Sequence, residues 1–456
     1  MSDNATRTFG FWGATGIGVG AIVGGGILLL AGVAFSKTGP SAILAFALSG
    51  TLAFITALSF AELSTRFPQS GGSYAFAKRV YSAETAFTVG WVVWFASIVA
   101  AVLYAIGFAR FAEVTIVEWI LMVGRTPPEW IRSPLFRQAV ACGAVFFYTA
   151  ALVRRTGASG QLATIGKTIV FVVLILGGFW AMRDMSPSVA AGQLRPFFTD
   201  GAIGFFQAMG YTFIAFQGFD LIAAVGGEVK NPRRNLPRSM FLSLGIALAI
   251  YIPFLFLICV VGITPGASIA EESSSRPVLI VALAVENFMG PWGYWFVMIA
   301  GILAMVSALN ANLLASSRIA LAMARDQALP PLFGTTHEAR GTPIHAILLS
   351  SALVLVILFT IPNVSVAGAA SSLIFLISFA LMHWTTFLTR KRSGRSRDSF
   401  TAPLFPAFPL VGLLGCAVLA VFQGVCGPVA GQLVLVWAGV GGLLYLLLFA
   451  RQTQMH

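Results

Sequence analysis

Two glycine-containing stretches could supply backbone groups for binding inside otherwise apolar segments. The first covers 16–27 and includes three consecutive glycines, Gly24, Gly25 and Gly26, while the second reads GYTFIAFQGFD over 210–220. Glycine disfavours a helix interior, and a broken helix leaves unpaired N–H groups where one half starts and unpaired C=O groups where the other ends. The N–H groups suit a carboxylate and the carbonyls suit an ammonium, so the pattern fits an α-amino acid.

Close packing of helices is the alternative explanation for the glycines. It accounts well for Gly16, Gly18 and Gly20, because small residues let two helices approach each other. It accounts less well for Gly24 to Gly26, since packing needs glycines at four-residue spacing and not three in a row. Non-helical backbone at membrane depth persists only where it is buried or lines a cavity. Paired interruptions in corresponding helices therefore predict a binding site.

Two ionisable residues stand within or beside these apolar runs. Lys167 lies in TIGKTIVFVV, and Asp220 directly follows Gly218-Phe219. A buried ammonium is unfavourable, so an intramembrane lysine is a functional candidate by default. The alternative for Lys167 is that its long side chain reaches the nearby membrane face. The alternative for Asp220 is a solvated carboxylate with no role in binding.

The composition places most of the chain in a bilayer. Of 456 residues, 58% are apolar and 10% charged, whereas a soluble domain has about 25% charged residues. Apolar runs long enough to cross a membrane recur along the chain. We predict an all-α polytopic membrane protein with about twelve spans, in which Leu255 faces lipid and the long eighth run starts as a separate helix around Val278–Phe288. The spans are expected at 12–36, 40–63, 85–109, 135–153, 162–182, 203–227, 239–262, 280–318, 343–361, 364–388, 404–424 and 430–450.

The basic residues predict the orientation, because Lys and Arg are enriched in cytoplasmic loops. With the N-terminus inside, the pairs Lys78-Arg79, Arg154-Arg155 and Arg233-Arg234 and the basic run 390–397 all fall on the cytoplasmic side. The net charge of +12 is then a topology signal, and no nucleic-acid partner is expected. The lipid bilayer is the expected surrounding, with both termini cytoplasmic and the protein in the inner cell membrane.

A membrane-embedded enzyme is the alternative from another class of function. It would need a constellation of His, Cys or acidic residues at depth. The cysteines lie in apolar runs, and the histidines lie in loops, at span ends or in the tail: His337, His345, His383 and His456. We therefore expect no metal, no cofactor and no catalytic residues. Glu62 and Arg66, four residues apart on one helix face, are expected to pair with each other.

Four segments together resemble the amino acid–polyamine–organocation (APC) superfamily of permeases, which share the LeuT-like fold. They are IVGGGILLLAG at 22–32, AELSTRFPQSGGSYAFAKR at 61–79, FIAFQGFDLIAAVGGEVKNPRRNLPRS at 213–239 and SALNANLLASSRIALAMARDQALPPLF at 307–333. The resemblance implies a 5+5 inverted repeat with broken helices one and six. The first repeat would cover 1–182 and the second 203–390, with two extra C-terminal helices in 404–450.

The resemblance also implies the site. The family pattern Ile-x-Gly-x-Gly-Ile falls on Ile22, Gly24, Gly26 and Ile27, so Gly24, Gly25 and Gly26 would receive a carboxylate. Carbonyls of the second break would receive the ammonium, Phe213 or Phe216 would act as a gate, and Lys167 would replace the sodium ion of sodium-coupled relatives. The acidic pair that often follows the sixth helix is Gly227-Glu228 here, a departure from the family. The implied substrate-binding set is completed by Ser97, Ala101, Tyr104, Ile214, Ala215, Gly218 and Asn312.

The expected function is therefore secondary active transport of amino acids by alternating access. Small or neutral amino acids are favoured, because no clear carboxylate was placed at the midplane to pair with a cationic side chain. Sodium is expected to be unnecessary, and proton coupling and exchange both remain open. A cationic amino acid or polyamine antiporter is the alternative within transporters.

Overall fold

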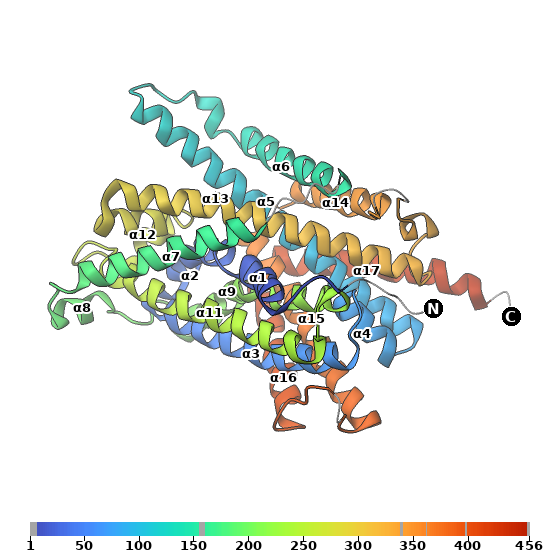
Figure 1. Cartoon of the computed structure of the whole chain (residues 1–456). Helices are drawn as coiled ribbons and strands as arrows, with labels where there is room; N and C mark the ends of the chain where they lie inside the picture. The colour runs from blue at the N-terminus through green and yellow to red at the C-terminus, as the bar shows by residue number, and fades with distance from the viewer. Residues whose placement is uncertain (1–6, 155–159, 338–340, 362, 397–398, 454–456) are drawn as a thin grey trace.

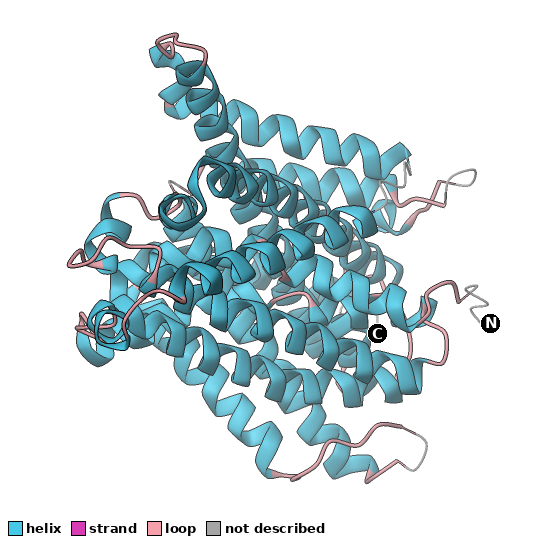
Figure 2. Cartoon of the chain, turned by 60° about the vertical axis from the view of Figure 1, so that its left-hand side comes forward, coloured by secondary structure: helices cyan, strands magenta, loops and turns pink. Residues whose placement is uncertain are grey.

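The computed structural model describes residues 7–154, 160–337, 341–361, 363–396 and 399–453. Arg155, Arg397 and His456 therefore lie outside the described residues. Within the described ranges, regular structure is helical, and the only bridge of the β type joins Phe9 to Val229 (Figure 2). The all-helical prediction is confirmed.

Each predicted span coincides with one helix or with a pair of half-helices (Figure 1). The sixth span is split by the short turn η3 (Phe213–Phe216), and α4 (Gly72–Val80), α8 (Pro187–Gln193) and α12 (Ile269–Ser275) are short connecting helices. The main helices are α1 (Phe11–Ile22), α2 (Gly25–Thr38), α3 (Ala42–Arg66), α5 (Ala83–Met122), α6 (Pro134–Arg154), α7 (Gly160–Met182), α9 (Gly201–Thr212), α10 (Phe219–Ala224), α11 (Pro232–Val260), α13 (Ile280–Arg325), α14 (Ile344–Leu358), α15 (Val364–Ser393), α16 (Ala407–Cys426) and α17 (Pro428–Thr453).

Nine stretches in the described part of the chain are long and apolar enough to cross a membrane. One of them, Phe11–Arg66, includes both the broken first span and the second. The split sixth span and α14 are shorter pieces. The eighth run divides as expected, because α13 has a non-helical residue at Gly290 (φ 68°, ψ −165°) just before Pro291. The division into two inverted repeats stays a prediction.

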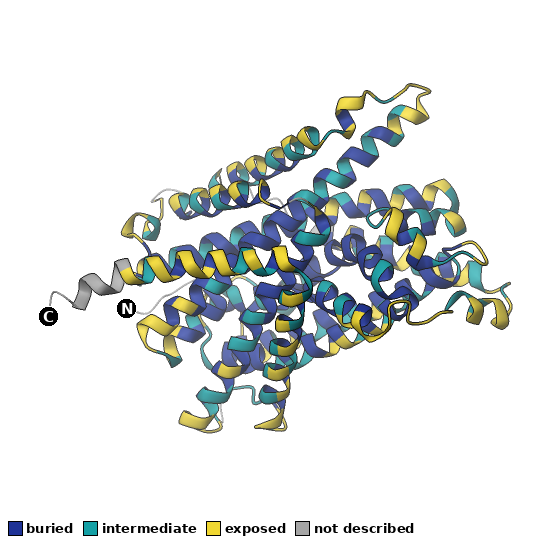
Figure 3. Cartoon of the chain, turned by 180° about the vertical axis from the view of Figure 1, so that it is seen from behind, coloured by how far each residue is buried: buried dark blue, intermediate teal, exposed yellow. Residues whose placement is uncertain are grey.

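Burial separates the central helices from those at the periphery (Figure 3). The most apolar window of Phe11–Arg66 is 94% buried and that of α5 is 83% buried, whereas those of α6 and α17 are each 17% buried. Exposed apolar faces of this kind suit contact with lipid. The prediction that Leu255 faces lipid was wrong: the residue is fully buried, because α11 packs against α1 and α3.

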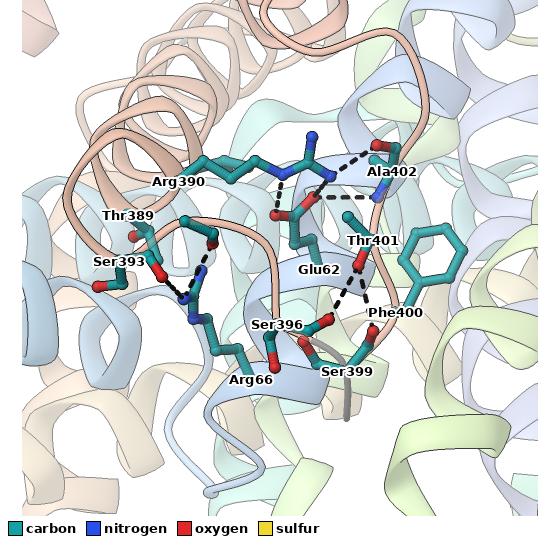
Figure 4. A network of polar contacts seen from close by, with 12 residues as sticks. Glu62, Arg66, Thr389, Arg390, Ser393, Ser396, Ser399, Phe400, Thr401 and Ala402 are labelled. Carbon is teal, nitrogen blue, oxygen red and sulfur yellow. Dashed lines mark hydrogen bonds and ion pairs between the residues drawn. The ribbon is translucent and has the colours of Figure 1, made fainter.

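Both chain termini lie at the right in Figure 1, and the α5–α6 connection lies at the upper left. We call these the terminal end and the α5–α6 end. At the terminal end, Arg390 on α15 donates from Nε and Nη2 to the two oxygens of Glu62 on α3, at 2.8 and 3.0 Å (Figure 4). The expected Glu62–Arg66 pair was wrong: Arg66 instead donates to the carbonyls of Ser393 and Gly394, 3.3 Å away in each case.

Two further ion pairs join separate elements at the terminal end. Arg318 on α13 lies 2.5 Å from Glu228, which follows α10, and Lys78 on α4 pairs with Asp326 directly after α13. Burial and the neighbouring Asp326 carboxylate raise the pKa of the Tyr74 hydroxyl on α4. The terminal end is therefore fastened by pairs that link α3 to α15, α10 to α13 and α4 to α13.

The sequence suggested that His383 lies at the end of its span, and this was wrong. It lies inside α15, which continues to Ser393, and it is fully buried. Its ring nitrogens contact Ser59 Oγ at 2.8 Å and Thr56 Oγ1 at 3.1 Å. Thr56 Oγ1 also donates to Leu52 O, so it accepts from His383 Nε2–H, and Ser59 Oγ bonds Nδ1. The imidazole thus joins α15 to α3 with both ring nitrogens paired.

Candidate functional site

The first break separates α1 from α2 at Val23 and Gly24. The last amide of α1 to bond within the helix is Val23 N, which donates to Val19 O at 2.9 Å, and α2 begins where Leu28 N donates to Gly24 O at 3.1 Å. Gly24 has φ 109° and ψ −55°, a conformation that a residue with a side chain rarely adopts. The first N–H groups of α2, from Gly25 to Ile27, have no acceptor within that helix.

The second break has a similar construction. The chain leaves α9 through η3, becomes extended at Gln217 and turns at Gly218, which has φ 145° and is the N-cap of α10. Thus a glycine with positive φ precedes the second half-helix in both breaks. The need for a positive φ explains why glycine occupies positions 24 and 218.

The two breaks lie against each other. A Cβ atom placed on Gly26 would be 2.3 Å from Ala215 Cα, and one placed on Gly218 would be 3.0 Å from Ile22 N. Real Cβ atoms do not approach backbone this closely, so a side chain at Gly26 would push α2 away from η3. The structure therefore brings together the predicted residues of both breaks: Ile22, Gly24, Gly25, Gly26, Phe213, Ile214, Ala215, Phe216 and Gly218.

Side chains from two neighbouring helices bond the carbonyls that the breaks expose. Lys167 on α7 is 1% exposed, and its Nζ donates to Gly20 O at 2.5 Å. Tyr251 on α11 donates its hydroxyl to Ile22 O at 2.6 Å and lies 3.2 Å from Ala215 O. Lys167 therefore points to the first break instead of reaching a membrane face. Tyr251 contacts both breaks with one hydroxyl.

The two half-helices that follow the breaks differ in their first turns. At α10, Asp220 Oδ1 accepts from Gly218 N at 2.9 Å, and Gln217 Nε2 lies 3.3 Å from the same oxygen. No acidic residue stands in the first turn of α2. The positive end of α10 thus has a carboxylate from the chain itself, and the positive end of α2 has none.

Of the predicted wall residues on α5 and α13, Tyr104 lies against the first break. A Cβ atom on Gly25 would be 2.8 Å from Tyr104 Cε1, and Ser97, Ala101 and Tyr104 are all buried on α5. Asn312 is buried on α13, and its Nδ2 donates to Ala308 O at 2.9 Å. Its Oδ1 is buried without a hydrogen-bond partner, as is Gln217 Oε1. Unpaired buried oxygens of this kind call for a further donor.

The two predicted gate residues lie in different surroundings. Phe216 packs against Tyr251 and Phe46, with ring centroids 5.4 and 6.2 Å apart. Phe213 instead packs against Phe379 on α15 at 5.8 Å. Phe213 therefore lies between the broken sixth span and α15, whereas Phe216 packs on α3 and α11, and the gate role of either residue stays a prediction.

Tyr251 is the site residue that the sequence reasoning missed. A single tyrosine in the apolar run LAIYIPFLF was available as a signal, because a buried tyrosine hydroxyl usually has a hydrogen-bond partner. The run gives no indication, however, that this partner is a carbonyl in a different helix. Lys167 was found because a charge in an apolar run is conspicuous by itself.

Fold and site together define a class: a polytopic helical membrane protein whose centre is formed by two facing helix breaks. The chain belongs to the amino acid permease family, which matches it over residues 9–445. An uncharacterized transporter of Mycobacterium tuberculosis is 29% identical, covering 98% of this chain and 92% of the relative.

Two other relatives carry more specific descriptions. A serine/threonine exchanger of Bacillus subtilis is 27% identical over 87% of this chain and 86% of its own length. A vacuolar cationic amino acid transporter of Arabidopsis thaliana is 26% identical over 78% of this chain and 55% of its own length. The relatives are thus transporters, with both neutral and cationic cargo among their names.

Replacing Tyr251 by phenylalanine should destabilise the bundle. Tyr251→Phe removes the hydroxyl that lies within hydrogen-bonding distance of Ile22 O and Ala215 O but keeps the ring and its packing. Leaving buried acceptors unpaired costs about 1–3 kcal/mol, so the unfolding midpoint in detergent should fall. Tyr148→Phe, at a half-buried tyrosine on the peripheral helix α6, is the matched control and should leave the midpoint unchanged. Equal midpoints for wild type and Tyr251→Phe would contradict the bridging role.

Proposed function

We propose that this permease is a secondary active transporter of α-amino acids, with small or neutral ones as the preferred cargo. The substrate carboxylate would bind the N–H groups of Gly25, Gly26 and Ile27 at the start of α2. The main support for this proposal is the difference between the first turns of α2 and α10. Asp220 already caps α10, whereas the equivalent end of α2 has no acidic residue and is free for a carboxylate from outside the chain.

The amino group of the substrate has acceptors nearby. Gln217 Oε1, in the second break itself, and Asn312 Oδ1 on α13 are buried without partners in the described part of the chain, and we propose that both face the amino group. Together with carbonyls of 213–215 they form a set that suits an ammonium. Backbone and amide groups then bind the part common to all amino acids, and the α5 wall at Ser97, Ala101 and Tyr104 limits the side chain.

A cationic amino acid is the second candidate, and Asp220 favours it. The sequence argument for neutral cargo depended on the absence of a carboxylate near the midplane. Asp220 lies at the second break, hydrogen-bonded to Gly218 N and Gln217. We still favour neutral cargo, because both hydrogen bonds of Asp220 are made within the chain and hold its carboxylate at the N-terminus of α10.

Lys167 supports sodium-independent transport. A sodium ion at the first break would need carbonyl oxygens as ligands. Gly20 O, one of the carbonyls freed by the break, instead accepts from the Lys167 ammonium. A fixed cation at this point would make a sodium ion unnecessary. If Lys167 loses its proton in another conformation, transport would be coupled to protons. If Lys167 stays charged throughout the cycle, the protein would work by exchanging one substrate for another.

Alternating access is supported by ion pairs between separate elements that could part and form again. Three ion pairs join separate elements at the terminal end, and a cavity of about 580 Å³ lies at the α5–α6 end. With the terminal end cytoplasmic, as the basic loops predict, these ion pairs would hold the cytoplasmic side closed. The opposite state would require the more exposed of these pairs, Arg318–Glu228 and Lys78–Asp326, to separate.

The carboxylate site is tested at Gly25. Gly25→Ala adds one methyl group that meets Tyr104 at 2.8 Å, so it should displace the ring and narrow the site. We expect amino acid binding to weaken about tenfold or more, equivalent to about 1.4 kcal/mol. The measurement is a thermal-shift titration of purified protein, beginning with wild type against the twenty amino acids and common polyamines.

Gly16→Ala is the matched control, because a Cβ there has no neighbour within 4 Å. It should keep the affinity of the wild type. Unchanged affinity in a well-folded Gly25→Ala protein would remove the carboxylate from the start of α2.

The two cargo classes are distinguished at Asp220. Asp220→Asn keeps the acceptor for Gly218 N and removes the negative charge. With neutral cargo, affinity for serine or alanine should change less than about threefold, since the charge contacts no substrate cation. With cationic cargo, binding of lysine or arginine should fall tenfold or more, because a charged partner is lost. Asp184→Asn, whose side chain is 80% exposed, is the control for the loss of one negative charge.

The role of Lys167 is tested by transport in proteoliposomes. Wild-type uptake should proceed at equal rates in sodium and choline buffers, and Lys167→Ala should reduce it strongly while exposed Lys230→Ala does not. Without substrate on the opposite side, concentrative uptake under an inward proton gradient would indicate symport. Uptake driven only by substrate on the opposite side would indicate exchange. Strict dependence on sodium would disprove the replacement of sodium by Lys167.

A further inference from the structure

A positively charged cavity lies at the α5–α6 end, apart from the helix breaks. It has a volume of about 580 Å³ and is lined from α2 at Val33, from α5 and α6, from the end of α12 and the segment after it, and from the end of α14 and the start of α15. Three arginines line it, Arg110, Arg137 and Arg276, and no aspartate or glutamate is among the lining residues. The volume falls in the range of small-molecule sites, about 300–1,000 Å³.

One buried carboxylate serves two of the three arginines. Glu113, with a side chain 4% exposed, lies 2.6 Å from Arg110 Nη1 and 3.2 Å from Arg137 Nη1. Arg137 also donates to Arg132 O at 3.1 Å. The Arg110 and Arg137 side chains remain 39% and 34% exposed. Each guanidinium has five N–H donors, so most donors of both are free to bind something else.

Arg276 adds a third charge from a different element. It follows α12, and it makes no ion pair with any residue in the described part of the chain. Three guanidinium groups thus line this cavity, and one carboxylate, Glu113, pairs with two of them. Low-dielectric walls of a single sign concentrate the field and attract ligands of the opposite charge.

We propose that this cavity binds the carboxylate of a small organic acid, as a second ligand site separate from the breaks. The planar guanidinium fork matches a carboxylate in geometry as well as in charge. Polar side chains complete the lining with both donors and acceptors: Gln138, Ser275, Thr360, Asn363 and Ser365. We infer that the ligand is the transported amino acid, which binds here before it reaches the breaks. This identity rests on the proposed function.

The test uses a cysteine reporter in the full-length protein. Ser365→Cys places a thiol in the cavity on α15, an element that carries none of the three arginines. Its rates of reaction with an anionic and a cationic methanethiosulfonate reagent are measured by mass spectrometry of the peptide that contains residue 365. Thr264→Cys, exposed outside the cavity, is the control position. We expect the anionic reagent to be favoured several-fold more at residue 365 than at residue 264, and Arg276→Gln to reduce this preference.

Protection by ligand tests binding itself. L-Alanine should slow the labelling of Ser365→Cys, whereas L-alaninamide, which lacks the carboxylate, should not. Protection should persist when Gly25→Ala is added, so this site can succeed or fail independently of the site at the breaks. Equal preference at residues 365 and 264, or equal protection by alanine and alaninamide, would overturn the proposal. Protection by phosphatidylglycerol vesicles and not by alanine would also overturn it, since the cavity would then hold a lipid headgroup.

Discussion

Backbone groups exposed by two helix breaks need partners in a place without water, and the centre of this protein is arranged around that need. An unpaired N–H or C=O group in a bilayer is strongly unfavourable. Lys167 bonds Gly20 O, and the Tyr251 hydroxyl bonds Ile22 O and approaches Ala215 O. These two side chains come from α7 and α11, so both helices have to lie beside the breaks. The close approach of Gly26 to Ala215 then keeps α2 against η3.

The same constraint explains why the two breaks are not equivalent. Each has a glycine N-cap with positive φ, and each starts a half-helix with unpaired N–H groups. At α10 the chain supplies its own acceptor, Asp220. At α2 it supplies none in the first turn. The N-terminus of α10 is thus capped by its own chain, whereas the N-terminus of α2 can accept an anion. This difference would fix the orientation of a molecule bound between the two breaks.

Local composition predicted more of the fold than of the contacts. The spans, both breaks and the separate start of the eighth helix followed from apolar runs, glycine runs and Gly290-Pro291. Lys167 was found for a similar reason, as a charge in an apolar segment. Tyr251, His383 and Arg390 depend on which helix lies opposite, and that information is not local. Glu62 shows the limit of local sequence reasoning. The four-residue spacing favoured Arg66 as its partner, yet Arg390 from α15 forms a bidentate pair with Glu62.

The three ion pairs at the terminal end are not equally easy to separate. The side chains of Glu62 and Arg390 are 4% and 9% exposed, and Glu62 also accepts from Ala402 N at 3.0 Å. Separating such a pair leaves buried charges without partners, which is strongly destabilising. The Arg318–Glu228 side chains are 32% and 27% exposed, and those of Lys78 and Asp326 are 53% and 23% exposed, so water can solvate them once apart. His383 adds a second buried connection between α3 and α15. If the terminal end opens as we propose, the least costly opening would therefore run between α13 on one side and α4 and the segment after α10 on the other, with α3 and α15 moving as one body.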